Sequence, residues 1–215
     1  IINVERIEDY PGLPDGISGA DFSSKVQEQA IASGTEFAMS EVMGIRKSGH
    51  EWIVDTYEGE KISKSIIVAG GSTLKKLNVP GENELVGAGV SYCATCDGAF
   101  FIDQRVCVVG GGDSALQEAI TLTGFASKVD VFCRSSCLHA QQTLQDQITG
   151  HEKIQVHLNV EVQEIHGDGM VDGVSLLQTL SGESKRVNID GVFIFVGLIP
   201  NTDYLQNILE TDESG

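Results

Sequence analysis

Basic residues are scarce in this sequence of 215 residues: 14 Lys and Arg stand against 31 Asp and Glu, giving a formal net charge of −17. So acidic a chain would repel a phosphate backbone, which argues against nucleic-acid binding. Long apolar runs are also missing. None approaches the roughly 20 residues of a membrane span, and no basic stretch followed by an apolar one suggests a signal peptide. With 41% hydrophobic and 21% charged residues, the composition is that of a globular protein.

Cysteines are few, and their number is odd: Cys93, Cys96, Cys107, Cys133 and Cys137. An odd count in a chain of this length does not match the disulfide framework of a small secreted domain. We therefore expect a reducing, cytosolic setting in which one pair of cysteines is special.

Strand and helix patterns alternate in the middle of the chain. An apolar run at 106–109 precedes a helical pattern at 113–123, and a second strand and a second helix are predicted at 128–133 and 138–148. This order predicts an α/β fold with a parallel sheet wound in βαβ units. Further expected features are a helix at 21–33, strands at 51–59, 65–69 and 192–196, and strands between 154 and 189 joined by turns at 167–169, 172–173 and 181–182.

The glycine-rich segment 110–115 follows the first of these strands and opens the first helix, and it fits the pattern G-x-G-x-x-G/A. Gly110 permits a tight turn, Gly112 lets the backbone approach a pyrophosphate, and Ala115 is small enough for close helix–strand packing. Asp113 and Ser114 begin the helix, whose free N–H groups favour a phosphate. A tight βα turn without a ligand is the alternative, because the pattern alone is weak.

Cys93 and Cys96 are separated by two residues, so their sulfurs can meet across one turn and form a reversible disulfide. Asp97 follows directly and can accept or donate a proton during thiol exchange. One alternative is half of a zinc site, completed by Cys133, Cys137 and His139, but their spacing is looser than metal sites require. Another is a chance pair of buried thiols. We expect no metal.

Arg134 follows the second strand of the βαβ unit. A site for NAD often has an acidic residue there, whereas an arginine suits the additional phosphate of NADP. An exposed surface arginine without a ligand is the alternative reading.

Cys93-Ala94-Thr95-Cys96-Asp97-Gly98, the glycine turn a dozen residues later and the segment Gly197-x-x-Pro200-Asn201-Thr202 occur in the order seen in one family. The chain resembles the low-molecular-weight thioredoxin reductases over nearly its whole length. The resemblance implies the two-domain pyridine nucleotide-disulfide oxidoreductase fold, in which an NADPH domain carrying the dithiol is inserted into a Rossmann-like FAD domain. Two short linker strands would join the domains.

By this resemblance, residues 1–73 belong to the FAD-binding domain, 74–198 form the NAD(P)H-binding domain, and 199–215 return to the FAD-binding domain. The family's first glycine turn is expected before Ile1 and its C-terminal flavin motif after Gly215, so the 215 residues are expected to be a fragment that holds FAD poorly by itself. Only one of the family's three phosphate-binding arginines is present, at Arg134. Besides the turn, the cofactor-contacting residues that the resemblance implies are Asp9, Ala69, Gly70, Gly71 and Gly197.

The resemblance implies a flavin-dependent disulfide reductase. Electrons would pass from NADPH through FAD to the disulfide of Cys93 and Cys96, and then to thioredoxin or a similar small dithiol protein. A cytoplasmic homodimer is expected. The alternatives are a relative that uses another electron donor, a nucleotide- or redox-responsive binding module without turnover, and a zinc-stabilised structural domain.

Overall fold

Two compact units make up the chain in the computed structural model: residues 1–73 with 198–215 form unit 1, and residues 74–197 form unit 2. The structure describes residues 1–212 except 3, 5, 8, 9, 206 and 207. Leu198 belongs to unit 1, one residue earlier than the predicted boundary. The cofactor that each unit binds stays a prediction.

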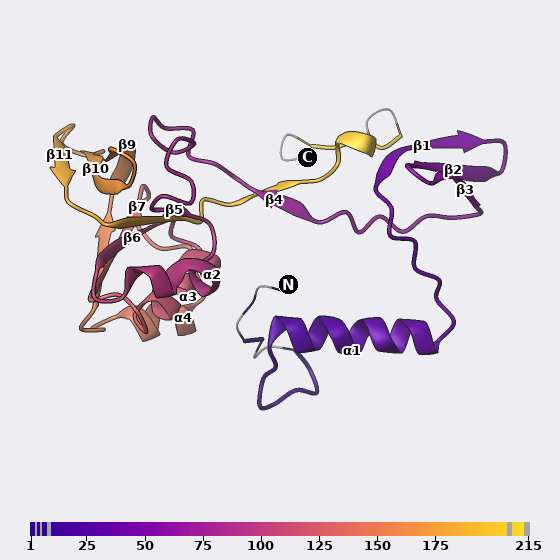
Figure 1. Cartoon of the computed structure of the whole chain (residues 1–215), viewed down its shortest axis with the longest axis horizontal. Coiled ribbons are helices and arrows are strands. Elements are labelled where there is room, and N and C mark those ends of the chain that lie inside the picture. The colour runs from indigo at the N-terminus through magenta and orange to yellow at the C-terminus, as the bar shows by residue number, and fades with distance from the viewer. Residues whose placement is uncertain (3, 5, 8–9, 206–207, 213–215) are drawn as a thin grey trace. The chain divides into compact units, whose positions relative to one another are not determined.

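Unit 2 is built on a parallel five-stranded sheet with the order β5-β12-β6-β7-β8. The sequence around its centre runs β6, α3, β7, α4, β8, which confirms the predicted α/β fold (Figure 1). The bounds are β5 Val90–Ser91, α2 Ala94–Asp97, the 3₁₀ helix η1 Gly98–Phe101, β6 Arg105–Val109, α3 Asp113–Leu122, β7 Lys128–Cys133, α4 Gln142–Ile148, β8 Ile154–Leu158 and β12 Gly191–Ile194.

Each face of this sheet has its own apolar core. Alternate residues such as Val106, Val108 and Val131 pack against the helices, whose buried side chains include Leu116 and Leu122. The opposite face is covered by an antiparallel sheet with the order β11-β10-β9. Its strands are β9 Val160–Gly167, β10 Val171–Gln178 and β11 Ser184–Val187. Both faces of these strands are buried. Their residues are therefore apolar along the whole strand instead of alternating between apolar and polar.

A buried acid interrupts the second face. Asp130, on β7, has no exposed surface and is ion-paired with Arg105, whose Nε lies 2.7 Å from Oδ2. Nε2 of His157 lies 2.7 Å from Oδ1. Burial alone would raise the pKa of Asp130, but the hydrogen bonds from His157 and Arg105 outweigh burial, and the pKa is lowered.

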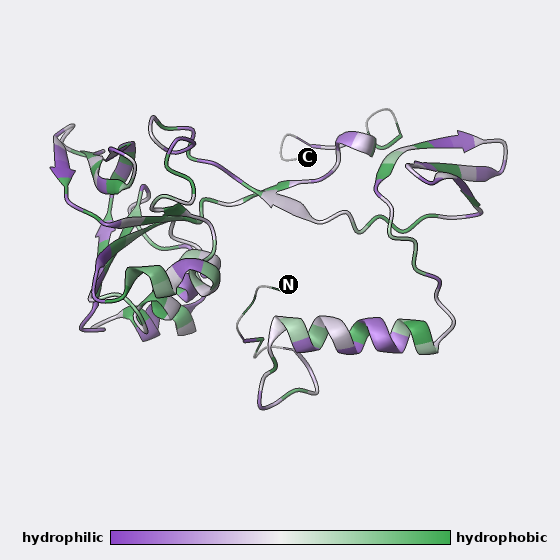
Figure 2. Ribbon diagram, in the orientation of Figure 1, coloured by the Kyte–Doolittle hydropathy of each residue, from purple (hydrophilic) through white to green (hydrophobic). Residues whose placement is uncertain are grey.

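Unit 1 contains α1, a three-stranded antiparallel sheet and part of a two-stranded ladder. Ser18 caps α1, since its side chain accepts a hydrogen bond from the Asp21 amide, and hydrophilic and hydrophobic residues alternate along this helix (Figure 2). The ladder pairs the two segments by which the chain enters and leaves unit 2. The bounds are α1 Gly19–Ala32, β1 Val42–Ser48, β2 Glu51–Thr56, β3 Gly59–Ser63, β4 Ser72–Leu74, β13 Leu198–Pro200 and the 3₁₀ helix η2 Asp203–Leu205.

Four predicted elements differ from the structure. The single strand predicted at 51–59 is two paired strands, β2 and β3, joined by a turn at Tyr57 and Glu58. Residues 65–69 are not a buried strand: the segment has no regular structure, and Ile67 is 94% exposed. Asp172 and Gly173 do not form a turn but lie inside β10, where the register shifts between Val171 and Gly173. The helix expected from residue 138 begins only at Gln142, because residues 138–141 are bound to the glycine turn described below.

Candidate nucleotide and dithiol sites

The glycine turn connects β6 to α3, as the sequence predicts, and its glycines have different steric roles. Gly110 has a φ of +145°, and a Cβ there would lie 2.2 Å from the Phe195 carbonyl oxygen, so only glycine fits. Gly112 has a φ of −98° and open space where a Cβ would be. Ala115 is fully buried. The backbone at Gly112 is therefore open to a ligand, whereas Gly110 and Ala115 bring strand and helix together.

The loop after β7 is attached to this turn by hydrogen bonds. The His139 amide donates to the Gly111 carbonyl at 2.8 Å. The Asp113 carboxylate accepts from the Gln141 amide at 2.6 Å and from the Gln141 side chain at 3.1 Å. Asp113 thus holds the loop in place, and this contact also explains why the chain between 138 and 141 is not helical.

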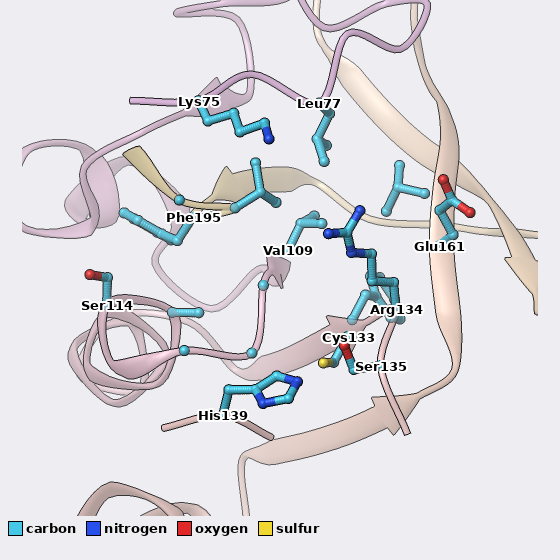
Figure 3. A pocket seen from close by; sticks show the side chains of 18 of the residues that line it. Lys75, Leu77, Val109, Ser114, Cys133, Arg134, Ser135, His139, Glu161 and Phe195 are labelled. Atoms are coloured by element: carbon cyan, nitrogen blue, oxygen red, sulfur yellow. The ribbon is translucent and has the colours of Figure 1, made fainter. Parts of the chain in front are cut away.

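A cavity of about 580 Å³ opens at the carboxyl ends of the parallel strands. Arg134 extends from the end of β7 toward its centre, Lys75 lies on the opposite wall and His139 lies below (Figure 3). Glu161 is part of the wall beyond Arg134. The cavity is also lined by seven residues predicted to contact a cofactor: Gly110, Gly112, Asp113, Ser114, Ala115, Arg134 and Gly197. The structure thus gathers the glycine turn and the arginine around one space, and ligand contact by each residue stays a prediction.

Lys75 and Lys76 also line this cavity, and neither is predicted from the sequence. Lys75 lies 59 positions before Arg134, so no local pattern connects the two. The parallel sheet brings the two together because the chain enters unit 2 beside the strand that leaves it: the Lys75 amide donates to the Gly197 carbonyl at 3.0 Å.

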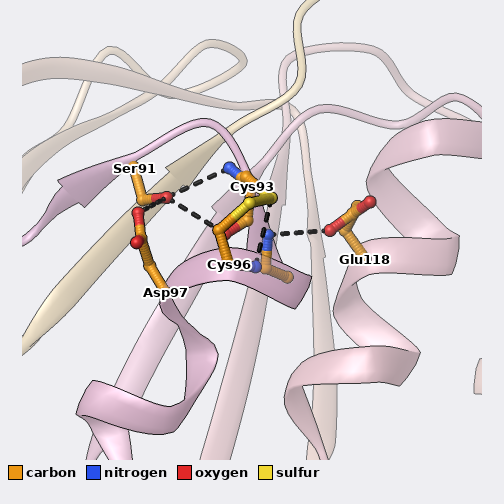
Figure 4. Close-up of a disulfide and its surroundings, with 6 residues drawn as sticks. Ser91, Cys93, Cys96, Asp97 and Glu118 are labelled. Carbon is orange, nitrogen blue, oxygen red and sulfur yellow. Dashed lines mark hydrogen bonds between the residues drawn. A yellow bond between two sulfur atoms is a disulfide. The ribbon is translucent and has the colours of Figure 1, made fainter. Parts of the chain in front are cut away.

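The second site is the disulfide that the sequence predicts between Cys93 and Cys96 (Figure 4). Cys93 precedes the short helix α2 and is partly buried, whereas Cys96 is exposed. The Cys96 amide donates to the Cys93 sulfur at 3.1 Å. Cys96 is therefore the more exposed residue of the pair.

Three polar side chains surround this disulfide. The Ser91 hydroxyl donates to the Asp97 carboxylate at 2.6 Å and accepts from the Cys93 amide at 3.0 Å. On the other side, Glu118 of α3 accepts from the Ala94 amide at 2.9 Å. Asp97 was predicted from its position in the sequence. Ser91 and Glu118 were not, and no sequence pattern indicates Glu118, which lies 24 residues from Ala94.

The remaining cysteines are not part of the disulfide. Cys107 is fully buried in β6, and burial raises the pKa of its thiol. Cys133 is buried beside Gly111, and Cys137 is exposed. Among the described residues, no group of three or more His, Cys, Asp or Glu side chains is arranged to hold a metal ion.

The predicted flavin contacts lie in unit 1. Ala69, Gly70 and Gly71 form an exposed segment, and the Gly70 carbonyl accepts from the Asn201 side chain at 3.0 Å. A Cβ on Gly70 would lie 2.7 Å from the Tyr204 hydroxyl and 3.1 Å from the Asn201 carbonyl oxygen, so a larger residue here would require the Tyr204 side chain to move. Asp9 lies outside the described residues. The roles of these four residues stay predictions.

Comparison with known proteins identifies the family. The profile of the family "Pyridine nucleotide-disulphide oxidoreductase" matches residues 5–215. Thioredoxin reductase from Bacillus subtilis (strain 168) is 41% identical over 99% of this chain and 67% of its own length. For Listeria monocytogenes thioredoxin reductase the identity is 43% over 100% of this chain and 67% of that protein. The chain belongs to the thioredoxin reductases, within this oxidoreductase family.

Solved structures of thioredoxin reductases share the fold. The Lactococcus lactis enzyme in its FR conformation matches with a TM-score of 0.95 and 40% identity, covering 100% of this chain and 71% of that one. The enzyme from T. acidophilum matches with a TM-score of 0.92 and 32% identity over 100% of this chain and 70% of that one. Membership in the thioredoxin reductases makes the chain an oxidoreductase with a redox disulfide. No helix in the described part of the chain is long and apolar enough to cross a membrane.

Proposed function

We propose that this protein is a flavin-dependent disulfide reductase that passes electrons from NAD(P)H through FAD and the Cys93–Cys96 dithiol to thioredoxin or a similar small dithiol protein. The observation that carries the proposal is the disulfide beside Asp97, located on the same α/β unit as a glycine turn with open space at Gly112. When bound, the nicotinamide nucleotide and the flavin supply the hydride and the electron pair that reduce the disulfide.

The nucleotide would bind in the cavity of unit 2. Its pyrophosphate would lie against the backbone of Gly112, at the start of α3, where amide groups have no partner within the helix. Arg134 and Lys75 would add positive charge on two walls. Arg134 would contact the additional phosphate of NADP, which makes NADPH the expected donor.

For the flavin, the open backbone at Gly71 supports a contact. Gly71 has a φ of +65° and nothing within 4 Å of the position of a Cβ, so a flat ring system could approach its backbone. Ala69 and Gly70 continue this exposed segment, and the sequence adds Asp9. These residues would touch the flavin but contribute no glycine turn at a helix start, which is the feature that holds a pyrophosphate.

Electron transfer to the partner would proceed by thiol–disulfide exchange. The thiolate of the exposed Cys96 attacks one sulfur of the partner's disulfide, and the partner's other sulfur leaves as a thiolate. Cys93 then attacks the sulfur of Cys96 in the mixed disulfide, which releases the reduced partner and restores the Cys93–Cys96 disulfide. Asp97, which accepts a hydrogen bond from Ser91, would donate a proton to the departing thiolate.

Trapping of the mixed disulfide tests this proposal. The Cys93→Ser variant should form a stable covalent adduct with a thioredoxin variant that keeps one active-site cysteine, activated as its mixed disulfide with thionitrobenzoate. Cys96 displaces thionitrobenzoate, and neither protein then has a second active-site thiol to resolve the adduct. Peptide mapping should locate the adduct at Cys96. The control adds Cys137→Ser to the Cys93→Ser variant and should leave the adduct unchanged, since Cys137 is the other exposed cysteine. An adduct at Cys137, or no adduct with Cys93→Ser, would overturn the proposal. Function as a cytoplasmic homodimer stays a prediction from the sequence.

A further inference from the structure

Glu118 connects the helix of the nucleotide turn to the dithiol. It lies on α3, five positions after Asp113, and its Oε2 accepts from the Ala94 amide at 2.9 Å (Figure 4). Ala94 is fully buried and lies between the two cysteines in sequence. The contact therefore joins a carboxylate on one element to the peptide backbone of the redox loop.

This hydrogen bond fixes the direction of the first residues of α2. With the Ala94 amide held by Glu118 and the Cys93 amide held by Ser91, the Cys96 amide is left to face the Cys93 sulfur at 3.1 Å. Amide donors near a sulfur favour the thiolate. Glu118 thus orients the Cys96 amide, which can donate a hydrogen bond to the Cys93 thiolate in the reduced protein.

The charge of Glu118 acts in the opposite direction. Together with Asp97, it places carboxylates on both sides of the loop that holds the dithiol (Figure 4). A nearby negative charge disfavours a cysteine thiolate. It therefore destabilises the reduced pair, which contains the thiolate, relative to the disulfide. The Glu118 side chain is only partly exposed, so water screens this effect incompletely.

We propose that Glu118 is a positioning residue that sets the redox equilibrium of Cys93 and Cys96, its charge making their disulfide harder to reduce. The inference rests on the proposed redox role of this pair. In the reaction concerned, two glutathione thiols reduce the disulfide: the Cys93–Cys96 bond breaks, one glutathione disulfide forms, and both protons pass to the new thiols. Above the pKa of one of these thiols, its proton goes to solvent and a thiolate remains.

Equilibration of the full chain in glutathione buffers at about pH 8.5, near the ordinary pKa of cysteine, tests the proposal. The fraction reduced is read by alkylation and mass mapping of the peptide containing Cys93 and Cys96. Glu118→Gln keeps an oxygen acceptor for the Ala94 amide but removes the charge. We expect the reduction equilibrium constant to rise about tenfold, equivalent to about 30 mV.

Two control variants separate charge from structure. Glu118→Asp keeps the charge and should remain within about twofold of the wild type, as should Glu152→Gln, which removes one charge from an exposed residue of the same unit. An unchanged constant in Glu118→Gln, or equal shifts in Glu118→Gln and Glu118→Asp, would overturn the inference. Failure of the wild-type disulfide to equilibrate at all would instead overturn the proposed function. The two substitutions are informative together because Glu118→Asp changes the geometry of the hydrogen bond to Ala94 and keeps the charge, whereas Glu118→Gln keeps an acceptor and removes the charge.

Discussion

The substitution Gly112→Ala distinguishes a nucleotide-binding turn from a turn that only connects a strand to a helix. At Gly112 the backbone has a φ of −98°, which alanine adopts freely, and no atom lies within 4 Å of the added Cβ. The methyl group would instead occupy the space through which a pyrophosphate approaches the backbone. The variant should therefore fold normally and bind NADPH weakly.

The expected magnitudes follow from the same geometry. Gly112 is the N-cap of α3, where alanine is less favourable than glycine, but removing a glycine stabilises the folded state by about 0.4–1 kcal/mol through the unfolded chain. These effects oppose each other, so the free energy of unfolding should change by less than about 1 kcal/mol. Loss of one hydrogen bond to a charged phosphate costs about 1.5–3 kcal/mol, which weakens binding roughly ten- to a hundredfold.

Calorimetric titration with NADPH and urea unfolding measure both quantities. Gly44→Ala, which makes the same change in unit 1 with only an ordinary contact to Asp55, should leave NADPH affinity unchanged. Gly110→Ala should behave differently from both, because its φ of +145° and the nearby Phe195 carbonyl strain the folded state itself. If Gly112→Ala binds NADPH as tightly as the wild type, the pyrophosphate does not lie on this turn and the nucleotide site must be sought elsewhere.

Two further predictions concern charged residues of unit 2. Calorimetry on Arg134→Ala should show NADPH affinity about tenfold weaker and NADH affinity unchanged, since the guanidinium would contact only the additional phosphate, and equal losses for both nucleotides would contradict this role. Asp130→Asn should lower the free energy of unfolding by about 2–4 kcal/mol near pH 7, because the amide cannot accept from both Arg105 and His157. The pKa of Asp130 is lower in the folded state, so its contribution is complete above the unfolded pKa near 4 and is lost as the pH falls through the folded value. Urea unfolding between pH 7 and pH 3 should show a difference between the two proteins that is retained down to about pH 4 and shrinks only below it, and a difference that already disappears near pH 5 would refute the argument.

Local patterns predicted the centre of unit 2 well. The bounds of β6, α3 and β7 follow from apolar runs and helical periodicity, which depend on residues close in sequence. The prediction at residues 65–69 was wrong because strand formation there depends on residues distant in sequence. A run such as Ile66-Ile67-Val68 becomes a strand only where another strand pairs with it, and in the described part of the chain it has no such neighbour. Apolar composition by itself therefore does not determine secondary structure.

The turn assigned to Asp172 and Gly173 shows how tertiary packing overrides a local signal. These residue types favour turns, yet β10 continues through them with a bulge, and a Cβ on Gly173 would lie 2.8 Å from the Val187 carbonyl oxygen. Here glycine permits close approach between paired strands. The sequence pattern could not distinguish this use of glycine from a turn, because the partner strand lies beyond the next loop.

The two candidate sites depend on one helix, α3, and this explains which of their residues a sequence can indicate. Gly112 at its start is recognised from the spacing of the turn, but Glu118 faces the dithiol only because α3 packs against α2. From Asp113 to Glu118 the helix rises about 7.5 Å, so the phosphate-binding end and the contact with Ala94 belong to one short rigid segment. Ala115, fully buried between them, sets how closely that segment approaches the sheet. Substitutions at Arg134 or Glu118 should therefore each affect one site, whereas a larger residue at 115 would displace the helix and disturb both.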